Sequence, residues 1–314
     1  MEPQLPHLAD PDSMPCWCGQ GTWRLCFRTA RFGLLRCSAC GCYRIDPPPL
    51  RQESASAAFY SEYYQRTIVE HAPVPIAPGR TSRFWRAASK VSALEQTGQS
   101  AVDIGCGDGH LCAELRAHGW PQVIGIDVSS ARIARARQLY PQLLFYDRSL
   151  EETDIAPGTL DLIVMDNVIE HLPTPLTMVC KLRPYLRPGG RLVIITPNME
   201  SGHFRLLGRR WTPELAPHAH IFLFTNDALC RLLLQAGLTP EASGSFHLPL
   251  HSWRRWMAIL RTRNLKEIVW TGLQESGSLY GRLVTAGPML FAVSRASSVD
   301  NRSHRDTERR QTDR

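Results

Sequence analysis

The sequence lacks an apolar run long enough to cross a bilayer, and its first residues lack the basic start and apolar stretch of a secretion signal. We therefore expect a cytoplasmic protein. Thiols stay reduced in that compartment, so the ten cysteines are not expected to form disulfides. Cysteines that cluster in the sequence are better explained as metal ligands.

Lysine is also scarce, because only three of the 36 lysines and arginines are lysines. The formal net charge of +7 could attract nucleic acid through its long-range field. Much of the arginine, however, lies in the last third of the chain, and residues 296–314 mix arginine with aspartate and glutamate. Such a mixed-charge tail is typical of solvated, disordered chain, so the net charge gives weak support for a nucleic-acid partner.

The length of 314 residues and the hydrophobic content of 43% favour one full-sized α/β domain with a small appendage. Shifts in composition divide the chain into four regions, and no internal repeat is evident. These regions are a cysteine-rich module at 14–46, a proline-rich linker or lid at 47–80, the main domain at 81–295 with a helical insertion at 251–283, and the disordered tail at 296–314.

Short apolar runs alternate with amphipathic stretches in the main domain, which predicts a parallel sheet with crossover helices. The expected strands cover residues 101–104, 123–126, 143–145, 160–165, 192–195, 238–246 and 288–294. The expected helices include 111–118, 130–140, 175–186 and 225–236. The segment Pro188-Gly189-Gly190 should end the third helix, and Thr225 and Gly237 should cap the fourth. The predicted fold class is α/β, with a Rossmann-like doubly wound, mostly parallel sheet of seven strands.

The first expected strand runs into a glycine-rich turn, Gly105-Cys106-Gly107-Asp108-Gly109, and then into a helix. Glycines let a ligand approach the backbone closely, and the helix start offers free N–H groups. A dinucleotide site would need a third glycine where His110 stands, so a smaller group fits better. Asp127 ends the second strand, where a carboxylate can accept hydrogen bonds from both hydroxyls of a ribose.

Four segments, at 102–109, 125–129, 160–172 and 186–192, resemble the class I S-adenosylmethionine-dependent methyltransferase superfamily in order. The resemblance covers residues 81–295. It implies that the cofactor's methionine part, ribose, adenine and sulfonium are each met by residues of these segments. The implied residues for the methionine part are Asp103, Gly105, Cys106, Gly107 and Gly109. Asp127 is implied for the ribose, Val128 for the adenine and Asn167 for a position beside the sulfonium. Leu150 is a further implied cofactor-binding residue. The carboxylate that often meets the adenine amino group in this superfamily is replaced by Ser149.

Methyl transfer from a sulfonium requires above all an aligned acceptor, and positioning alone can supply about 7 to 11 kcal/mol of the barrier. A hydroxyl acceptor also needs a base, and histidine suits this role because its ordinary pKa is about 6.5. The catalytic candidates are His220, in the long segment before the helix at 225–236, and His171, which follows Glu170. The alternative is that Glu170 and His171 serve packing and hydrogen bonding and that His220 only fixes its loop.

The cysteine-rich module contains two knuckle-like pairs, Cys16-Trp17-Cys18-Gly19 and Cys37-Ser38-Ala39-Cys40-Gly41. Four thiolates suit tetrahedral Zn²⁺, which would replace the core that so short a module lacks. The first pair has one intervening residue where two are usual, so Cys26 and Cys42 are alternative ligands. The module resembles the N-terminal zinc ribbon of a group of bacterial methyltransferases, which adds a zinc-ribbon-like module to the fold class.

Several functions compete at this stage. The favoured one is methyl transfer to a small-molecule acceptor such as a sugar, a polysaccharide precursor or a secondary metabolite. An RNA methyltransferase with a zinc module is an alternative, although residues 166–169 lack the Asn-Pro-Pro-aromatic motif of many base-methylating enzymes. A non-catalytic S-adenosylmethionine-binding protein is another. Residues 252–283, rich in arginine and tryptophan, are compatible with peripheral membrane contact or with a helix that packs on its own domain.

Overall fold

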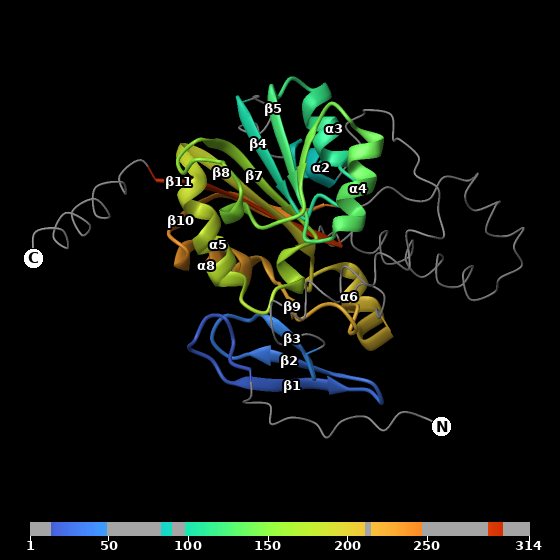
Figure 1. Cartoon of the computed structure of the whole chain (residues 1–314). Coiled ribbons are helices and arrows are strands. Elements are labelled where there is room, and N and C mark those ends of the chain that lie inside the picture. The colour runs from blue at the N-terminus through green and yellow to red at the C-terminus, as the bar shows by residue number, and fades with distance from the viewer. Residues whose placement is uncertain (1–13, 49–82, 90–97, 211–214, 247–287, 298–314) are drawn as a thin grey trace, which may run out of the picture.

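The computed structural model describes residues 14–48, 83–89, 98–210, 215–246 and 288–297 (Figure 1). Most of the linker or lid, the helical insertion and most of the tail lie outside the described residues, so the predictions for them stay predictions. Within the described ranges, no helix combines the length and the apolar character that crossing a membrane requires.

The larger sheet has seven strands, which confirms the predicted fold class, and their order is β10-β11-β8-β7-β4-β5-β6. The strands are β4 (Ser100–Ile104), β5 (Gln122–Ile126), β6 (Leu144–Tyr146), β7 (Leu160–Asp166), β8 (Leu186–Pro197), β10 (Leu238–Phe246) and β11 (Met289–Ala296). The five from β6 to β8 pair in parallel, whereas β11 and β10 add antiparallel pairs at one edge.

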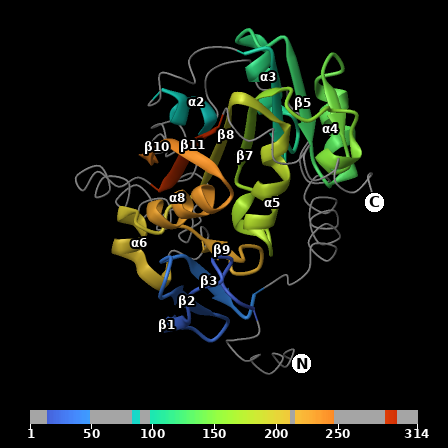
Figure 2. The same ribbon diagram turned by 90° about the vertical axis from the view of Figure 1, so that its left-hand side faces the viewer.

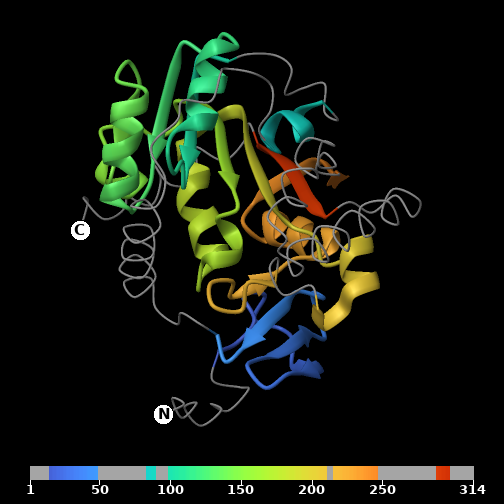
Figure 3. The same ribbon diagram turned by 90° about the vertical axis from the view of Figure 1, so that its right-hand side faces the viewer.

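Helices cover both faces of this sheet, as a parallel sheet requires. Successive side chains of a strand point to opposite faces. In β8, Leu192 and Ile194 accordingly pack in one apolar cluster, and Val193 and Ile195 pack in another. The helices on the second face are α2 (Arg83–Ala88), α3 (His110–Ala117) and α4 (Ser130–Leu139), and those on the first face are α5 (Pro175–Leu182) and α8 (Asn226–Gln235) (Figures 1 and 3).

The predicted ends of α8 are confirmed, whereas the predicted end of α5 is wrong. In α8 the Thr225 side chain accepts a hydrogen bond from the Ala228 N–H, and Gly237 follows with φ +78°, which confirms both caps. The prediction for residues 188–190 is wrong, because α5 ends at Leu182, a 3₁₀ turn η5 (Arg183–Tyr185) follows, and β8 already begins at Leu186. Pro184 explains the early end, since it has no N–H to continue the helical hydrogen bonds.

A second, smaller sheet contains β1 (Trp23–Arg28), β2 (Gly33–Cys37), β3 (Tyr43–Asp46) and β9 (Phe222–Leu223), in that order. The first three strands come from the cysteine-rich module, and β9 comes from the main domain. Views from opposite sides both show this sheet below the larger one, beside β9 and α6 (Gly202–Leu207) (Figures 2 and 3). The module therefore continues directly into the main domain through a shared sheet.

Candidate active site

The carboxyl ends of β4, β5 and β7 meet where the strand order of the larger sheet reverses. β4 lies between β5, which follows it in the chain, and β7, which comes later. In open α/β sheets, ligands bind outside the carboxyl ends of the strands at such a point. Three carboxylates lie there, Asp103 in β4, Asp127 after β5 and Asp166 at the end of β7. The glycine turn at residues 105–109, where a ligand was predicted, directly follows β4 and so lies at this same edge.

The glycine turn adopts a conformation that favours glycine, because Gly105, Gly107 and Gly109 have φ of +74°, +54° and +78°. A Cβ added at Gly109 would lie 2.6 Å from the ring of Phe145. A Cβ added at Gly107 would meet no described atom within 4 Å. Gly109 is thus needed for packing, and Gly107 borders an open space that a ligand can enter.

Asp127 links the glycine turn to the second strand. Its Oδ2 accepts a hydrogen bond from the Gly107 N–H at 2.9 Å, and its Oδ1 accepts one from the Ser129 N–H at 2.8 Å. Burial raises the pKa of this carboxyl, and the two N–H donors oppose the rise. Each oxygen keeps a lone pair for a further donor. The geometry is therefore compatible with the predicted contact to two ribose hydroxyls.

Asp103 and Asp166 make the same corner acidic. Asp103 is buried, and burial together with the charges of Asp166 and Asp127 raises its pKa well above the usual range. Arg83 on α2 donates to Asp166 at 2.6 Å and partly offsets the effect of burial on the Asp166 pKa. Clustered carboxyls of this kind favour a positively charged ligand. No pattern in the sequence pointed to Arg83, since only the fold brings α2 to β7.

The other residues predicted to meet the cofactor differ in exposure. Cys106 and Leu150 are buried, whereas Val128 is 51% exposed. Asn167 has a left-handed φ of +56°, and its buried Oδ1 has no hydrogen-bond partner among the described residues. The cofactor roles of these residues stay predictions.

Both predicted catalytic histidines lie together around Glu170. The rings of His171 and His220 are 4.6 Å apart between centroids. Glu170 Oε1 lies 3.9 Å from Nε2 of His171 and 4.0 Å from Nε2 of His220. Glu170 and His171 belong to a 3₁₀ turn, η4 (Ile169–His171), that follows β7. We call these three residues the Glu-His-His cluster.

The surroundings of the Glu-His-His cluster fix its side chains. The Thr196 hydroxyl, near the end of β8, donates to Glu170 Oε2 at 2.9 Å. Nδ1 of His171 lies 3.2 Å from the Ala219 carbonyl oxygen and donates to it, because a carbonyl can only accept. Burial raises the pKa of Glu170 to about 8 and lowers that of His171 to about 4. Sequence reasoning assigned Glu170 and Thr196 no part in the chemistry, although the adjacency of Glu170 to His171 was visible.

Comparison with known proteins shows the family of the chain. Residues 79–243 match a family model described as a methyltransferase domain, which covers more than half of the chain. The chain belongs to this methyltransferase family. The enzyme is an S-adenosylmethionine-dependent methyltransferase, and S-adenosylmethionine is its cofactor.

Named relatives are similar to part of the methyltransferase. The ubiquinone biosynthesis O-methyltransferase of Aromatoleum aromaticum is 32% identical over 164 residues, which cover 49% of this chain and 70% of that protein. The trans-aconitate 2-methyltransferase of Azoarcus sp. (strain BH72) is 38% identical over 124 residues, which cover 37% of this chain and 48% of that protein.

A solved structure is similar over a larger part of the methyltransferase. It is a chain of the complex between the Haloferax volcanii Trm112 methyltransferase activator and a methyltransferase. The TM-score is 0.55 at 15% identity, and the match covers 76% of this chain and 97% of that chain. At this identity the likeness supports the fold alone.

The methyltransferase also brings four cysteine sulfurs together in the smaller sheet. The Sγ atoms of Cys16 and Cys40 are 3.5 Å apart, and those of Cys18 and Cys37 are 3.7 Å apart. All four residues are buried, and their sulfurs lie within 4.8 Å of one another. We call these residues the four-cysteine cluster; they are the ligand set favoured from the sequence.

Local geometry supports the knuckle interpretation of this cluster. Gly19 and Gly41, which follow the two cysteine pairs, have φ of +68° and +76°. The N–H of each glycine donates to the carbonyl of the first cysteine of its pair, at 2.9 Å to Cys16 and 3.2 Å to Cys37. The alternative ligands lie outside the cluster, since Cys26 is exposed and the Cys42 thiol donates to the Leu223 carbonyl at 3.2 Å.

Backbone contacts connect the smaller sheet to the Glu-His-His cluster. β3 pairs with β9 through Tyr43 and Leu223 and through Arg44 and Phe222. Just before β9, the Ile221 carbonyl accepts from the Ile45 N–H at 3.1 Å. The Ile221 N–H in turn donates to the Glu170 carbonyl at 2.8 Å. His220 therefore lies two residues before the strand that joins the smaller sheet to the main domain.

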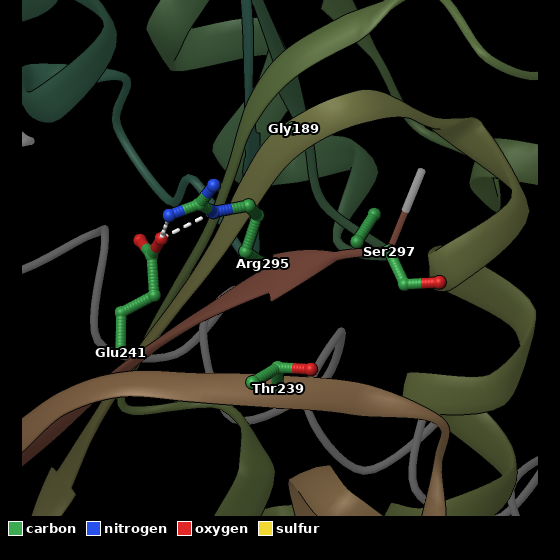
Figure 4. Close-up of a pocket in the computed structure, with 6 residues that line it drawn as sticks. Gly189, Thr239, Glu241, Arg295 and Ser297 are labelled. Atoms are coloured by element: carbon green, nitrogen blue, oxygen red, sulfur yellow. Dashed lines mark hydrogen bonds and ion pairs between the residues drawn. The ribbon is translucent and has the colours of Figure 1, made fainter. Parts of the chain in front are cut away.

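A separate pocket lies at the opposite end of the larger sheet. Its lining consists of Gly189, Thr239, Glu241, Arg295, Ala296 and Ser297 (Figure 4). Glu241 forms ion pairs with Arg295 and, at 2.8 Å, with Arg191. These residues lie at the amino end of β8, away from the end where the predicted cofactor residues gather, so the pocket is not part of the candidate active site.

Proposed function

We propose that the methyltransferase transfers a methyl group to a hydroxyl oxygen of a small molecule, such as a sugar, a polysaccharide precursor or a secondary metabolite. The observation that carries this proposal is the Glu-His-His cluster, which begins three residues after Asn167, the residue expected beside the sulfonium. Imidazole and carboxylate groups are the side chains that most often activate a hydroxyl. The relative from Aromatoleum aromaticum is an O-methyltransferase, which also supports an oxygen acceptor.

The corner at β4, β5 and β7 fits the cofactor chemically. When bound, S-adenosylmethionine supplies a methyl group that its sulfonium has already made electrophilic. The free lone pairs of Asp127 suit the two ribose hydroxyls, and the exposed side chain of Val128 offers an apolar surface for the adenine. The open space beside Gly107 leaves room for the methionine part, and Asp103 and Asp166 favour its positive groups.

Residues near the acceptor must exclude water and activate the acceptor hydroxyl. The Glu-His-His cluster is almost enclosed, because Glu170 is fully buried and His220 is 7% exposed. An acceptor that covers the remaining exposed side of His171 would exclude water from the reacting atoms. We assign activation of the acceptor hydroxyl to this cluster, and so retain both predicted histidines in the chemistry.

We also propose that the four-cysteine cluster holds a structural zinc ion. Four buried sulfurs within 4.8 Å of one another match the closed tetrahedral sites of structural zinc. Borderline-soft Zn²⁺ suits thiolate ligands, and a strand module of this size has little apolar core of its own.

Methyl transfer to a panel of hydroxylated small molecules, with a labelled methyl group on the cofactor, tests the proposed function. We expect label in an ether product and S-adenosylhomocysteine as the second product. An RNA preparation and a panel of amines serve as competing acceptors. Label that enters only RNA or only amines would contradict the proposal.

A further inference from the structure

We propose that Glu170, His171 and His220 bind a divalent cation of the first transition series beside the acceptor. Each side chain offers one ligand atom, and the three atoms lie within 4.8 Å of one another. The cluster is separate from the four-cysteine cluster in position and in chemistry, because its ligands are two imidazoles and one carboxylate.

The distances within the cluster suit a shared ion better than direct hydrogen bonds. Hydrogen-bonded nitrogen and oxygen atoms lie about 2.7 to 3.2 Å apart. The Glu170 oxygen is 3.9 and 4.0 Å from the two imidazole nitrogens, which is too long. Ligand atoms that share one tetrahedral ion, each about 2.0 to 2.2 Å from it, lie about 3.3 to 3.6 Å apart, so a small inward shift of these side chains would bring them to one ion.

Hydrogen bonds also fix the orientation of two of the three groups, His171 and Glu170. The Ala219 carbonyl takes the Nδ1 hydrogen of His171, so in the neutral ring Nε2 keeps its lone pair and faces Glu170. The Thr196 hydroxyl fixes Glu170 through Oε2, and the other oxygen, Oε1, accepts no hydrogen bond from the described residues. Metal-binding histidines and carboxylates are usually held by outer partners of this kind.

The donor set selects the kind of cation. Two imidazoles with one carboxylate suit Mn²⁺, Fe²⁺, Co²⁺ or Zn²⁺, whereas Mg²⁺ and Ca²⁺ prefer oxygen ligands. Three protein ligands also leave positions open, as metal centres with a catalytic role do. The side chain of His171, at 19% exposure, marks the side from which an acceptor can reach the ion.

A cation here deepens the proposed function and rests on it for its purpose. It would bind the acceptor oxygen and lower the pKa of its hydroxyl, so that the proton passes to solvent. The oxygen then forms its bond to the methyl carbon as the bond between that carbon and sulfur breaks. On this view the two histidines hold the ion, and the ion activates the hydroxyl. The preferred acceptor is one that presents an oxygen ligand to a metal.

Mn²⁺ titration of the full-length, zinc-loaded protein, followed by electron paramagnetic resonance, tests the cation site. The zinc is limited to one equivalent per chain, so that it fills the four-cysteine cluster and leaves the Glu-His-His cluster available to Mn²⁺. We expect one bound Mn²⁺ per chain, displaced by Co²⁺ or Zn²⁺ more readily than by Mg²⁺. Glu170→Gln, His171→Asn and His220→Asn should each weaken Mn²⁺ binding by more than about 100-fold, and Thr196→Val by about 10-fold.

The matched control is His118→Asn, because His118 is the C-cap residue of α3 and its ring Nδ1 donates to the Glu114 carbonyl at 2.7 Å. It should bind Mn²⁺ as the unchanged protein does. Thermal unfolding and binding of S-adenosylhomocysteine establish that each variant is folded. The proposal is overturned if the unchanged protein binds no Mn²⁺, or if folded variants of the three ligands bind it equally well.

The same titration separates this proposal from the proposed function. Bound Mn²⁺ that is lost in the ligand variants supports the cation site even if no hydroxyl acceptor is methylated. Methylation of a hydroxyl by a protein free of any ion at this cluster overturns the cation site and leaves the proposed function intact.

Discussion

The four-cysteine cluster and the Glu-His-His cluster differ in how the chain assembles them. The outermost two cysteines of the first are 24 residues apart, and all four sulfurs are buried. The Glu-His-His cluster joins two segments that only the fold brings together, since His171 contacts Ala219 across 48 residues. A closed set of four ligands is typical of a structural metal, and an open set of three is typical of a catalytic one. Under the two proposals, one cluster therefore serves folding and the other serves chemistry.

The largest effect is expected from Cys37→Ser, which removes a thiolate from the closed cluster. The smaller sheet should lose zinc and unfold, because metal binding replaces the core that this module lacks. Zinc per chain by mass spectrometry and thermal unfolding check this. Cys26→Ser is the control, since Cys26 is exposed and should leave both quantities unchanged. Full zinc content in the Cys37→Ser variant would contradict the structural zinc role of the four-cysteine cluster.

His220→Ala should act on chemistry and leave folding largely intact. We expect kcat for the hydroxyl acceptor to fall by about 10² to 10⁴-fold, because the activating group is lost. The affinity for S-adenosylhomocysteine should stay within about twofold, since His220 is not among the residues predicted to bind the cofactor. Steady-state kinetics and calorimetry make the measurement. Unchanged kcat with normal cofactor binding would remove His220 from the mechanism.

Brief treatment with a chelator should distinguish the two clusters directly. The open cluster should lose its ion first, because three ligands hold it and one side is accessible. Methyl transfer should fall by about tenfold or more and return on addition of Mn²⁺. Zinc content and the midpoint of thermal unfolding should not change during this treatment. If zinc leaves before activity falls, the assignment of structural and catalytic roles is wrong.

Asp127→Ala tests whether the cofactor corner is independent of both clusters. Loss of hydrogen bonds to a charged carboxylate costs about 1.5 to 3 kcal/mol, so cofactor affinity should fall by about 10 to 100-fold. Metal content at both clusters should stay the same. Calorimetry with S-adenosylhomocysteine measures the affinity, and exposed Asp154 provides the control variant Asp154→Ala. Equal affinity in both variants would exclude Asp127 as the ribose ligand.

The smallest effect is expected from Gly107→Ala. A side chain in a left-handed conformation costs about 1 to 2 kcal/mol, and Gly107 has φ +54°. Gly158→Ala is a matched control, because Gly158 has φ +75° and its added Cβ also meets no described atom within 4 Å. Both variants should lose similar stability in denaturant unfolding. Only Gly107→Ala should also weaken cofactor binding, and equal binding would place the open space outside the cofactor site.

The sequence predicted the elements whose pattern is local. The strand at 238–246 and the helix capped by Thr225 are both confirmed, because apolar periodicity and cap chemistry act over a few residues. The end of α5 was mispredicted, since the missing N–H of Pro184 ends the helix before the glycines are reached. The seven strands followed from the alternation of elements, but their detailed bounds depended on neighbours in the sheet.

The candidate site could be predicted only in part, because some of its contacts are local in the sequence and others join distant segments. The glycine turn and Asp127 are separated by one crossover unit, and the structure joins them by a direct hydrogen bond. The contacts of Glu170 with His220 and of Arg83 with Asp166 depend on elements far apart in the chain. β9 has only two residues and therefore carries no periodic signal. Its pairing with β3 could be recognised only from the fold.

The pairing of β3 with β9 has a consequence for how such enzymes diversify. A boundary near residue 46 is visible in the composition, yet hydrogen bonds cross it from Ile45 to Ile221 and onward to Glu170. A foreign N-terminal module acquired by recombination at that boundary would have to present a matching edge to residues 222–223. Modules in this lineage are therefore expected to be inherited together with the loop they pair with, and chimeras should carry both pieces from one parent.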